Sequence, residues 1–228
     1  MRRRWSQIVV VLVMVIVIII GVFMIKGKEK TPDTPTFNHD FTKEFLVKNA
    51  EAPEGFHLFE SGTEKYTMLF PENYYMSDGS YNKKTGNTSD MPDTENVYMQ
   101  QEGISPKESQ MIKGVKLFLH PGGNVLIDST LRIMLEDINA PANTKVEKYE
   151  EENKTVYYAE NIDKYHADDG SVDRIFYFHG FIADNNSKQA LYFNLRNKCF
   201  NIDTKECEIG FEKEKKMGLE MMKSVEFK

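Results

Sequence analysis

Residues 173–196 read DRIFYFHGFIADNNSKQALYFNLR and contain two runs rich in aromatic and β-branched side chains. Runs of this kind favour strands, and the polar segment 184–187 between them is typical of a hairpin turn. Large apolar side chains alternate along the second run, so they would share one face of a strand: Leu191, Phe193 and Leu195. The stretch therefore predicts two antiparallel strands, at 173–183 and 188–196.

The same pattern continues towards the N-terminus and predicts a larger sheet. The turn 168–171 separates the hairpin from another aromatic and β-branched run at 155–162, so three consecutive strands would form an antiparallel meander. Further strands are expected at 64–70, 96–101 and 115–120 because apolar and polar residues alternate there. A polar stretch, 77–96, holds almost no strong hydrophobes and is expected to be a long loop.

Helical periodicity appears in two other segments. Ser129 is a good N-cap for a helix at 130–139, whose apolar residues fall on one face: Leu131, Met134, Leu135 and Ile138. A second helix is expected at 211–225. It would bury Phe211, Gly218, Met222 and Val225 and turn Lys213, Glu214, Lys215 and Lys216 outward. A shorter helix at 40–49 completes the set. The sequence thus predicts an α+β fold, with helices packed on an antiparallel sheet in one domain.

The first 40 residues have a different organisation. Residues 8–25 carry no charge, and a helix of about 20 residues spans a bilayer core. Three arginines precede this run, which favours a cytoplasmic N-terminus. The run is longer than the apolar region of a signal peptide, lacks an A-x-A-like cleavage site, and has no cysteine near its end for a lipid. The alternative of a cleaved signal peptide stays open.

These features divide the chain into four parts: a cytoplasmic basic tail at 1–7, a transmembrane signal anchor at 8–25, a juxtamembrane linker at 26–40 and an extracytoplasmic domain at 41–228. The predicted location is the cell membrane, crossed once, with the C-terminal domain extracellular. Membrane lipid is therefore one expected partner, through residues 8–25.

Charge excludes one class of partner. The whole chain has a net charge of −6, and residues 31–228 carry 23 Lys and Arg against 34 Asp and Glu, a net charge of −11. Nucleic-acid binders show a basic excess, so we expect no nucleic acid partner. The expected partner is an extracytoplasmic protein or a component of the cell envelope.

The histidines offer one site for chemistry. None of the five has the spacing of a metal ligand set, so we expect no metal and no cofactor. His120 and His179 are both expected at strand ends, from where they could converge across the sheet as an acid and base pair. With Asp168 in an acidic turn, they define the alternative function, a cell-envelope hydrolase or other enzyme. No residue is otherwise predicted to be catalytic.

Cys199 and Cys207 are the only two cysteines. If the segment between them folds back, their Cα atoms can come within about 6 Å, the separation that a disulfide needs. An extracytoplasmic location permits oxidation. We expect these two cysteines to form a disulfide.

The order of elements resembles the PsbP-like α/β/α sandwich superfamily over residues 56–228. The resemblance rests on the segment YTMLFPENY at 66–74 and on the closing segment MKSVEF at 222–227. Tyr74 stands where the family more often has Trp, and Asn73 replaces a Gly. The resemblance implies a sandwich fold and a mostly non-enzymatic role in binding, without naming any catalytic residue. The predicted function is a non-enzymatic, membrane-anchored extracytoplasmic domain that binds a protein partner or an envelope component.

Overall fold

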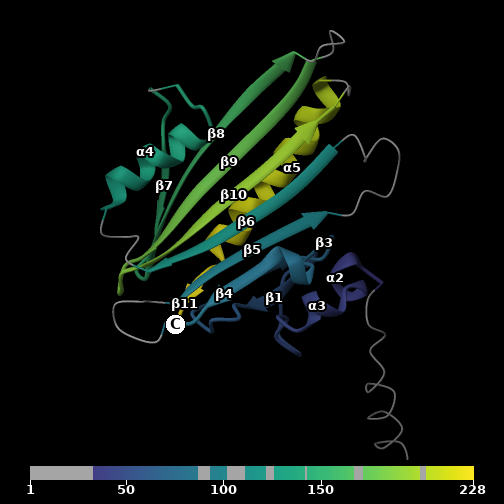
Figure 1. Cartoon of the computed structure of the whole chain (residues 1–228), viewed down its shortest axis with the longest axis vertical. Helices are drawn as coiled ribbons and strands as arrows, with labels where there is room; N and C mark the ends of the chain where they lie inside the picture. The colour runs from purple at the N-terminus through teal and green to yellow at the C-terminus, as the bar shows by residue number, and fades with distance from the viewer. Residues whose placement is uncertain are drawn as a thin grey trace, which may run out of the picture. The chain divides into compact units, whose positions relative to one another are not determined.

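The computed structural model describes residues 33–86, 93–101, 111–121, 126–141, 143–166, 172–200 and 204–228 (Figure 1). The chain divides into two units, Met1–Asp33 and Thr34–Lys228. Within the described ranges, no helix is both long enough and apolar enough to cross a membrane. The predicted anchor at 8–25 and the turn at 168–171 lie outside the described residues.

A large antiparallel sheet forms the centre of the second unit. Its strands lie in the order β3 (Tyr74–Tyr75), β5 (Thr94–Gln101), β6 (Met111–Pro121), β10 (Gln189–Cys199), β9 (Val172–Asp184), β8 (Lys154–His166) and β7 (Glu147–Glu150), and β4 (Tyr81–Lys84) also pairs with β5. The predicted meander is confirmed, because β8, β9 and β10 are consecutive neighbours. The three apolar side chains that define its buried face are enclosed: Leu191, Phe193 and Leu195.

A second, small sheet packs beside the first. It has the order β1 (Phe56–Glu60), β2 (Tyr66–Pro71) and β11 (Glu226–Phe227). The strand predicted at 64–70 corresponds to β2, whereas β1 and β11 were not predicted. Strand β1 is held by its pairing with β2 and by a backbone hydrogen bond from Glu60 N to Phe45 O at 2.8 Å.

The stretch 77–96, predicted as a loop, is partly structured. It contains a single 3-10 turn, η1 (Asp78–Ser80), then β4, and the start of β5. Residues 87–92 lie outside the described residues, and one aromatic residue of β4 connects the described part of this segment to its surroundings. Tyr81 packs its ring at 4.7 Å from that of Phe45 and donates a hydrogen bond to Glu95 Oε1 at 2.7 Å.

Two helices cover opposite faces of the large sheet. Helix α5 (Thr204–Lys223) packs on the face that contains Leu191 and its neighbours, and α4 (Ile127–Asp137) packs on the other face (Figure 1). The predicted N-cap Ser129 is wrong, because α4 begins earlier, after Leu126, whose side chain makes no capping hydrogen bond. Helix α5 also begins seven residues before the predicted start.

The contact between α5 and the sheet is close. Phe211 of α5 stacks on Phe176 of β9 with ring centroids 4.5 Å apart. Further along, a Cβ on Gly180 would lie 2.1 Å from Met222 Sδ, so this glycine makes room for the helix. Glu214, predicted to face outward, is instead buried on the sheet side, where it accepts hydrogen bonds from Tyr74 and Lys113.

The folded unit begins before the predicted boundary at residue 41. Two single-turn helices, α2 (Pro35–Asn38) and α3 (Asp40–Lys43), precede β1. Thr36 is fully buried, and its hydroxyl lies 3.0 Å from Pro71 O and 2.8 Å from Tyr74 O. The folded unit therefore includes residues 34–40, which were predicted to belong to the linker at 26–40. The helix predicted at 40–49 is limited to the single turn of α3.

Candidate functional site

The face of the large sheet that carries α4 also holds a cavity. The helix covers part of β9 and β10 through Met134 and Ile138. Beside the helix, over β5, β6 and β10, lies a cavity of about 510 Å³, which we call the sheet groove. Its lining residues are Tyr98, Gly114, Lys116, Asp137, Tyr177, His179, Asn194, Arg196 and Lys198.

Strand register arranges the floor of the sheet groove in rows. One row crosses four adjacent strands and consists of Tyr98, Lys116, Asn194 and His179. Because neighbouring strands lie about 4.8 Å apart, this row is about 14 Å long. The next row contains Gly114, Arg196 and Tyr177. A Cβ on Gly114 would lie 2.8 Å from Tyr98 Oη, so the glycine makes room for the Tyr98 ring to lie across the floor.

A second cavity continues the sheet groove past β5. It measures about 800 Å³, extends to η1 and β4, and shares Tyr98 and Lys116 with the first. Four amide side chains line the two cavities together: Asn82, Asn96, Gln100 and Asn194. Amides and tyrosines provide hydrogen-bond donors, hydrogen-bond acceptors and ring faces, which suits a polar ligand.

The sheet groove carries three cations that stack on aromatic rings. Lys116 lies 5.5 Å from the ring centroid of Tyr98, and Arg196 lies 5.5 Å from that of Tyr177. Lys198 lies 4.5 Å from the ring of Phe200. Within the part of the chain that the structure describes, none of the three forms an ion pair with a carboxylate.

His179 contributes an uncharged polar group to the sheet groove. Its side chain is 7% exposed, and its Nδ1 atom has no hydrogen-bond partner among the described residues. Burial, and then the charge of Arg196, lower the pKa of His179 from 6.5 to about 4. The imidazole is therefore neutral at pH 7 and can form hydrogen bonds without adding to the positive charge of the cavity.

The structure does not bring the two candidate histidines together. Both lie on the same face of the sheet, but His120 is opposite Ala190 and His179 is opposite Asn194. Four residues of a strand span about 13 Å. The placement of His179 at a strand end is wrong, since β9 continues to Asp184. Asp168 lies outside the described residues, so only His179 of this set lines the groove.

No cluster of three or more His, Cys, Asp or Glu residues in the described ranges is placed to hold a metal ion. The two cysteines are joined in a disulfide between Cys199 of β10 and Cys207 of α5, with Cα atoms 6.3 Å apart. Both are buried, and the bond attaches the start of α5 to the end of β10. Neither sulfur is therefore available as a nucleophile in this state.

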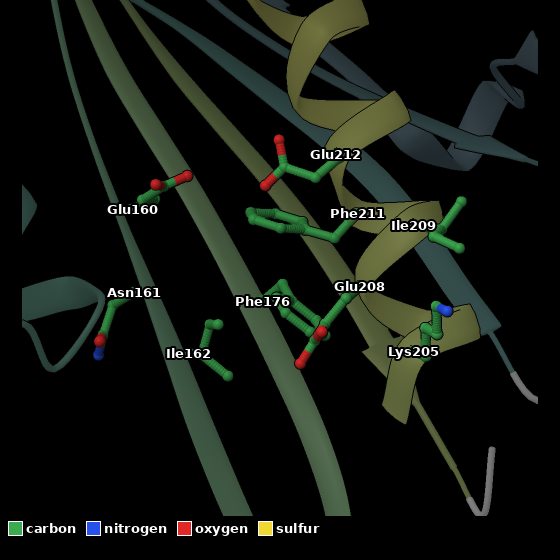
Figure 2. Close-up of a pocket in the computed structure, with 9 residues that line it drawn as sticks. All are labelled: Glu160, Asn161, Ile162, Phe176, Lys205, Glu208, Ile209, Phe211 and Glu212. Carbon is green, nitrogen blue, oxygen red and sulfur yellow. The ribbon is translucent and has the colours of Figure 1, made fainter. Parts of the chain in front are cut away.

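A third cavity, of about 680 Å³, lies between α5 and the strands β8 and β9 (Figure 2). Figure 2 shows the rings of Phe176 and Phe211 between α5 and β9, with three carboxylates around them: Glu160, Glu208 and Glu212. None of its described lining residues has a buried polar atom without a hydrogen-bond partner. The sheet groove, which has such an atom and three cations outside ion pairs, is the stronger candidate site.

Most residues of the sheet groove were not predicted as site residues. Asn194, Arg196 and Lys198 recur at every second position of β10, on the face opposite the buried apolar residues. This period is the signal that could have identified them. The lysine and tyrosine that face them come from β6 and β5, and only the strand order places them there.

One comparison with known proteins gives a match. The model of a family described as "Putative lipoprotein YvcA" matches residues 32–226. No curated protein matches the chain, and neither does any solved structure. The match covers the unit Thr34–Lys228 except for its last two residues. The resemblance to PsbP-like domains is not addressed by this match and stays a prediction.

Proposed function

Because this chain belongs to the family described as "Putative lipoprotein YvcA", we propose that it acts as a membrane-anchored extracytoplasmic domain that binds a component of the cell envelope. A lipoprotein is held at a membrane surface, which agrees with the apolar run at 8–25. That run is the proposed anchor, crossing the membrane once from a cytoplasmic N-terminus. Lipid attachment would need a free cysteine, but Cys199 and Cys207 are joined to each other.

The disulfide also supports the extracytoplasmic location. Structural disulfides persist in oxidising compartments and are rare in the cytosol. Cys199 and Cys207 follow the predicted anchor in the chain, so they would lie on the outer side if the N-terminus is cytoplasmic. The proposed topology and the bond are thus mutually consistent.

The observation that carries the binding function is the sheet groove. Its floor is a rigid strand surface that presents amides, tyrosines and cations to one side. Rigid strands of this kind hold polar groups in fixed positions, as recognition of a ligand requires. Its histidine is neutral and enclosed, about 13 Å along the strand direction from His120. We therefore propose binding rather than catalysis as the role of the domain.

Co-sedimentation with envelope material tests this function. The purified full-length chain, held in nanodiscs of neutral lipid, is mixed with isolated cell envelope from its source and centrifuged. We expect retention of the wild type and loss of most retention in Tyr98→Ala. The matched control is Tyr149→Ala, because Tyr149 also lies beneath a lysine, Lys223 at 4.4 Å, but outside the groove.

Two results would contradict the proposal. Equal retention of Tyr98→Ala and the wild type would exclude the sheet groove as the binding site. Absence of retention of the wild type itself would exclude the isolated envelope as the source of the ligand.

A further inference from the structure

We infer that the ligand of the sheet groove is an oligoanion, a polar molecule with repeated phosphate or carboxylate groups. This inference rests on the proposed function and specifies its ligand class. The sheet groove combines three cations outside ion pairs, regularly spaced backbone positions for these cations, and polar uncharged groups that a ligand with hydroxyls would satisfy.

The first argument is that the sheet groove is positively charged, whereas the chain as a whole is negatively charged. Residues 31–228 have a net charge of −11, so carboxylates outnumber cations in this part of the chain taken as a whole. In the sheet groove the relation is reversed, with Lys116, Arg196 and Lys198 against the single carboxylate of Asp137. Cations gathered in a cavity repel each other, and they favour an anion that enters between them.

The second argument is the spacing of the three cations. Lys116 of β6 is directly opposite Asn194 of β10, and the other two cations follow at alternate positions of β10: Arg196 and Lys198. Alternate residues of a strand are about 7 Å apart. The Cα positions of the three cations therefore follow one another in steps of about 7 Å along the strand direction, over about 13 Å in all, and the side chains of Lys116 and Arg196 lean to opposite sides, over Tyr98 of β5 and Tyr177 of β9. A single ion would contact only part of this series, whereas a chain of anionic units can contact all of it.

The third argument is the polar lining between the cations. Asn194 and His179 occupy adjacent positions of the same row, and His179 Nδ1 lacks a hydrogen-bond partner among the described residues. Buried polar atoms without a partner in the protein are rare, and such an atom is available to a water molecule or a ligand. Asp137 at the side of the sheet groove can accept hydrogen bonds from hydroxyls. These groups suit a ligand that carries hydroxyl groups between its anionic groups.

Calorimetric titration tests the ligand class. The full-length chain in phosphatidylcholine nanodiscs is titrated with four probes: a phosphodiester-linked glycerol oligomer, oligogalacturonate, neutral cellohexaose and inorganic phosphate. We expect at least one oligoanion to bind tenfold or more tightly than either of the last two. That affinity should fall as NaCl is raised, since salt screens exposed charges. The first two probes distinguish phosphate from carboxylate as the recognised anion.

Substitutions locate the site. Arg196→Gln and Lys116→Gln should each weaken oligoanion binding by about tenfold and reduce its dependence on salt. The matched control is Arg132→Gln, because Arg132 lies on α4 with its side chain 75% exposed and outside the groove. Circular dichroism melting curves of all three variants check that the fold is retained.

Three outcomes would overturn the inference. In the first, neutral cellohexaose or inorganic phosphate binds as tightly as the oligoanions. In the second, Arg196→Gln binds the oligoanions as tightly as the wild type does. In the third, the wild type co-sediments with the envelope and Tyr98→Ala does not, but the chain binds no oligoanion. The proposed function would then stand and the ligand class would be wrong. Absence of both oligoanion binding and co-sedimentation would reject the proposed function as well.

Discussion

Acidification should destabilise the folded chain through His179. Its pKa is about 4 in the folded protein, because burial and the charge of Arg196 disfavour the imidazolium form. In the unfolded chain the pKa returns to about 6.5. Between these values the unfolded chain binds a proton that the folded chain does not. The free energy of unfolding therefore begins to fall as the pH drops below 6.5, and the loss is complete below about pH 4.

The size of this effect follows from the two pKa values. They differ by about 2.5 pH units, and each unit corresponds to about 1.4 kcal/mol, so the full loss is about 3 kcal/mol. Small domains are stabilised by only about 5–15 kcal/mol in total. The charged groups around the imidazole, which are Lys116, Arg196, Lys198 and Asp137, keep a net positive charge and oppose its protonation.

Urea unfolding followed by circular dichroism at a series of pH values from 7.5 to 4 measures the loss. His179→Gln removes the titrating group, so the stability of the wild type relative to this variant should fall by about 3 kcal/mol over that range. The carboxylates titrate in both proteins, so their contributions cancel in the difference between the two free energies of unfolding. His120→Gln, at an exposed position on the same sheet face, is the matched control for the removal of an imidazole. A difference between wild type and His179→Gln that is constant with pH would refute the reasoning.

Three further substitutions test the packing of α5, each by urea or thermal unfolding. Cys207→Ser should lower the free energy of unfolding by about 2.5 kcal/mol for the short closed loop and abolish the effect of dithiothreitol on stability. Gly180→Ala should cost about 1–3 kcal/mol because its Cβ overlaps Met222, and combining it with Met222→Ala should cost less than the sum of the two changes. Glu214→Gln should cost about 3–5 kcal/mol, since it leaves Lys113 without its carboxylate partner at 3.0 Å, and Lys113→Met in the same chain should recover part of that loss.

The long strands could be predicted from the sequence because they repeat their pattern many times. The runs that became β8, β9 and β10 are rich in aromatic and β-branched residues and are separated by polar turns, so their existence and order along the chain followed from these two signals. The shortest strands have no such pattern. β3 and β11 contain two residues each, and they exist only because a distant strand offers a partner.

The sheet groove could not be predicted because it depends on strand order. The polar period of β10 is visible in the sequence, but β6 becomes its neighbour across a long crossover that no local signal indicates. The burial of Glu214 was missed for the same reason. Helical periodicity placed it on the solvent side, whereas Lys113 of β6 and Tyr74 of β3 supply its partners from the sheet.

The small sheet has a consequence for how the chain folds during synthesis. β11 is made after every other element, yet it completes the sheet by pairing with β2, and Leu69 N donates a hydrogen bond to Ser224 Oγ, 155 residues later in the chain. At a synthesis rate of about 5–20 residues per second, these two residues emerge about 8–30 s apart. An unpaired strand edge is a site for association with other chains. Each growing molecule therefore exposes one edge of β2 for that interval, until β11 covers it.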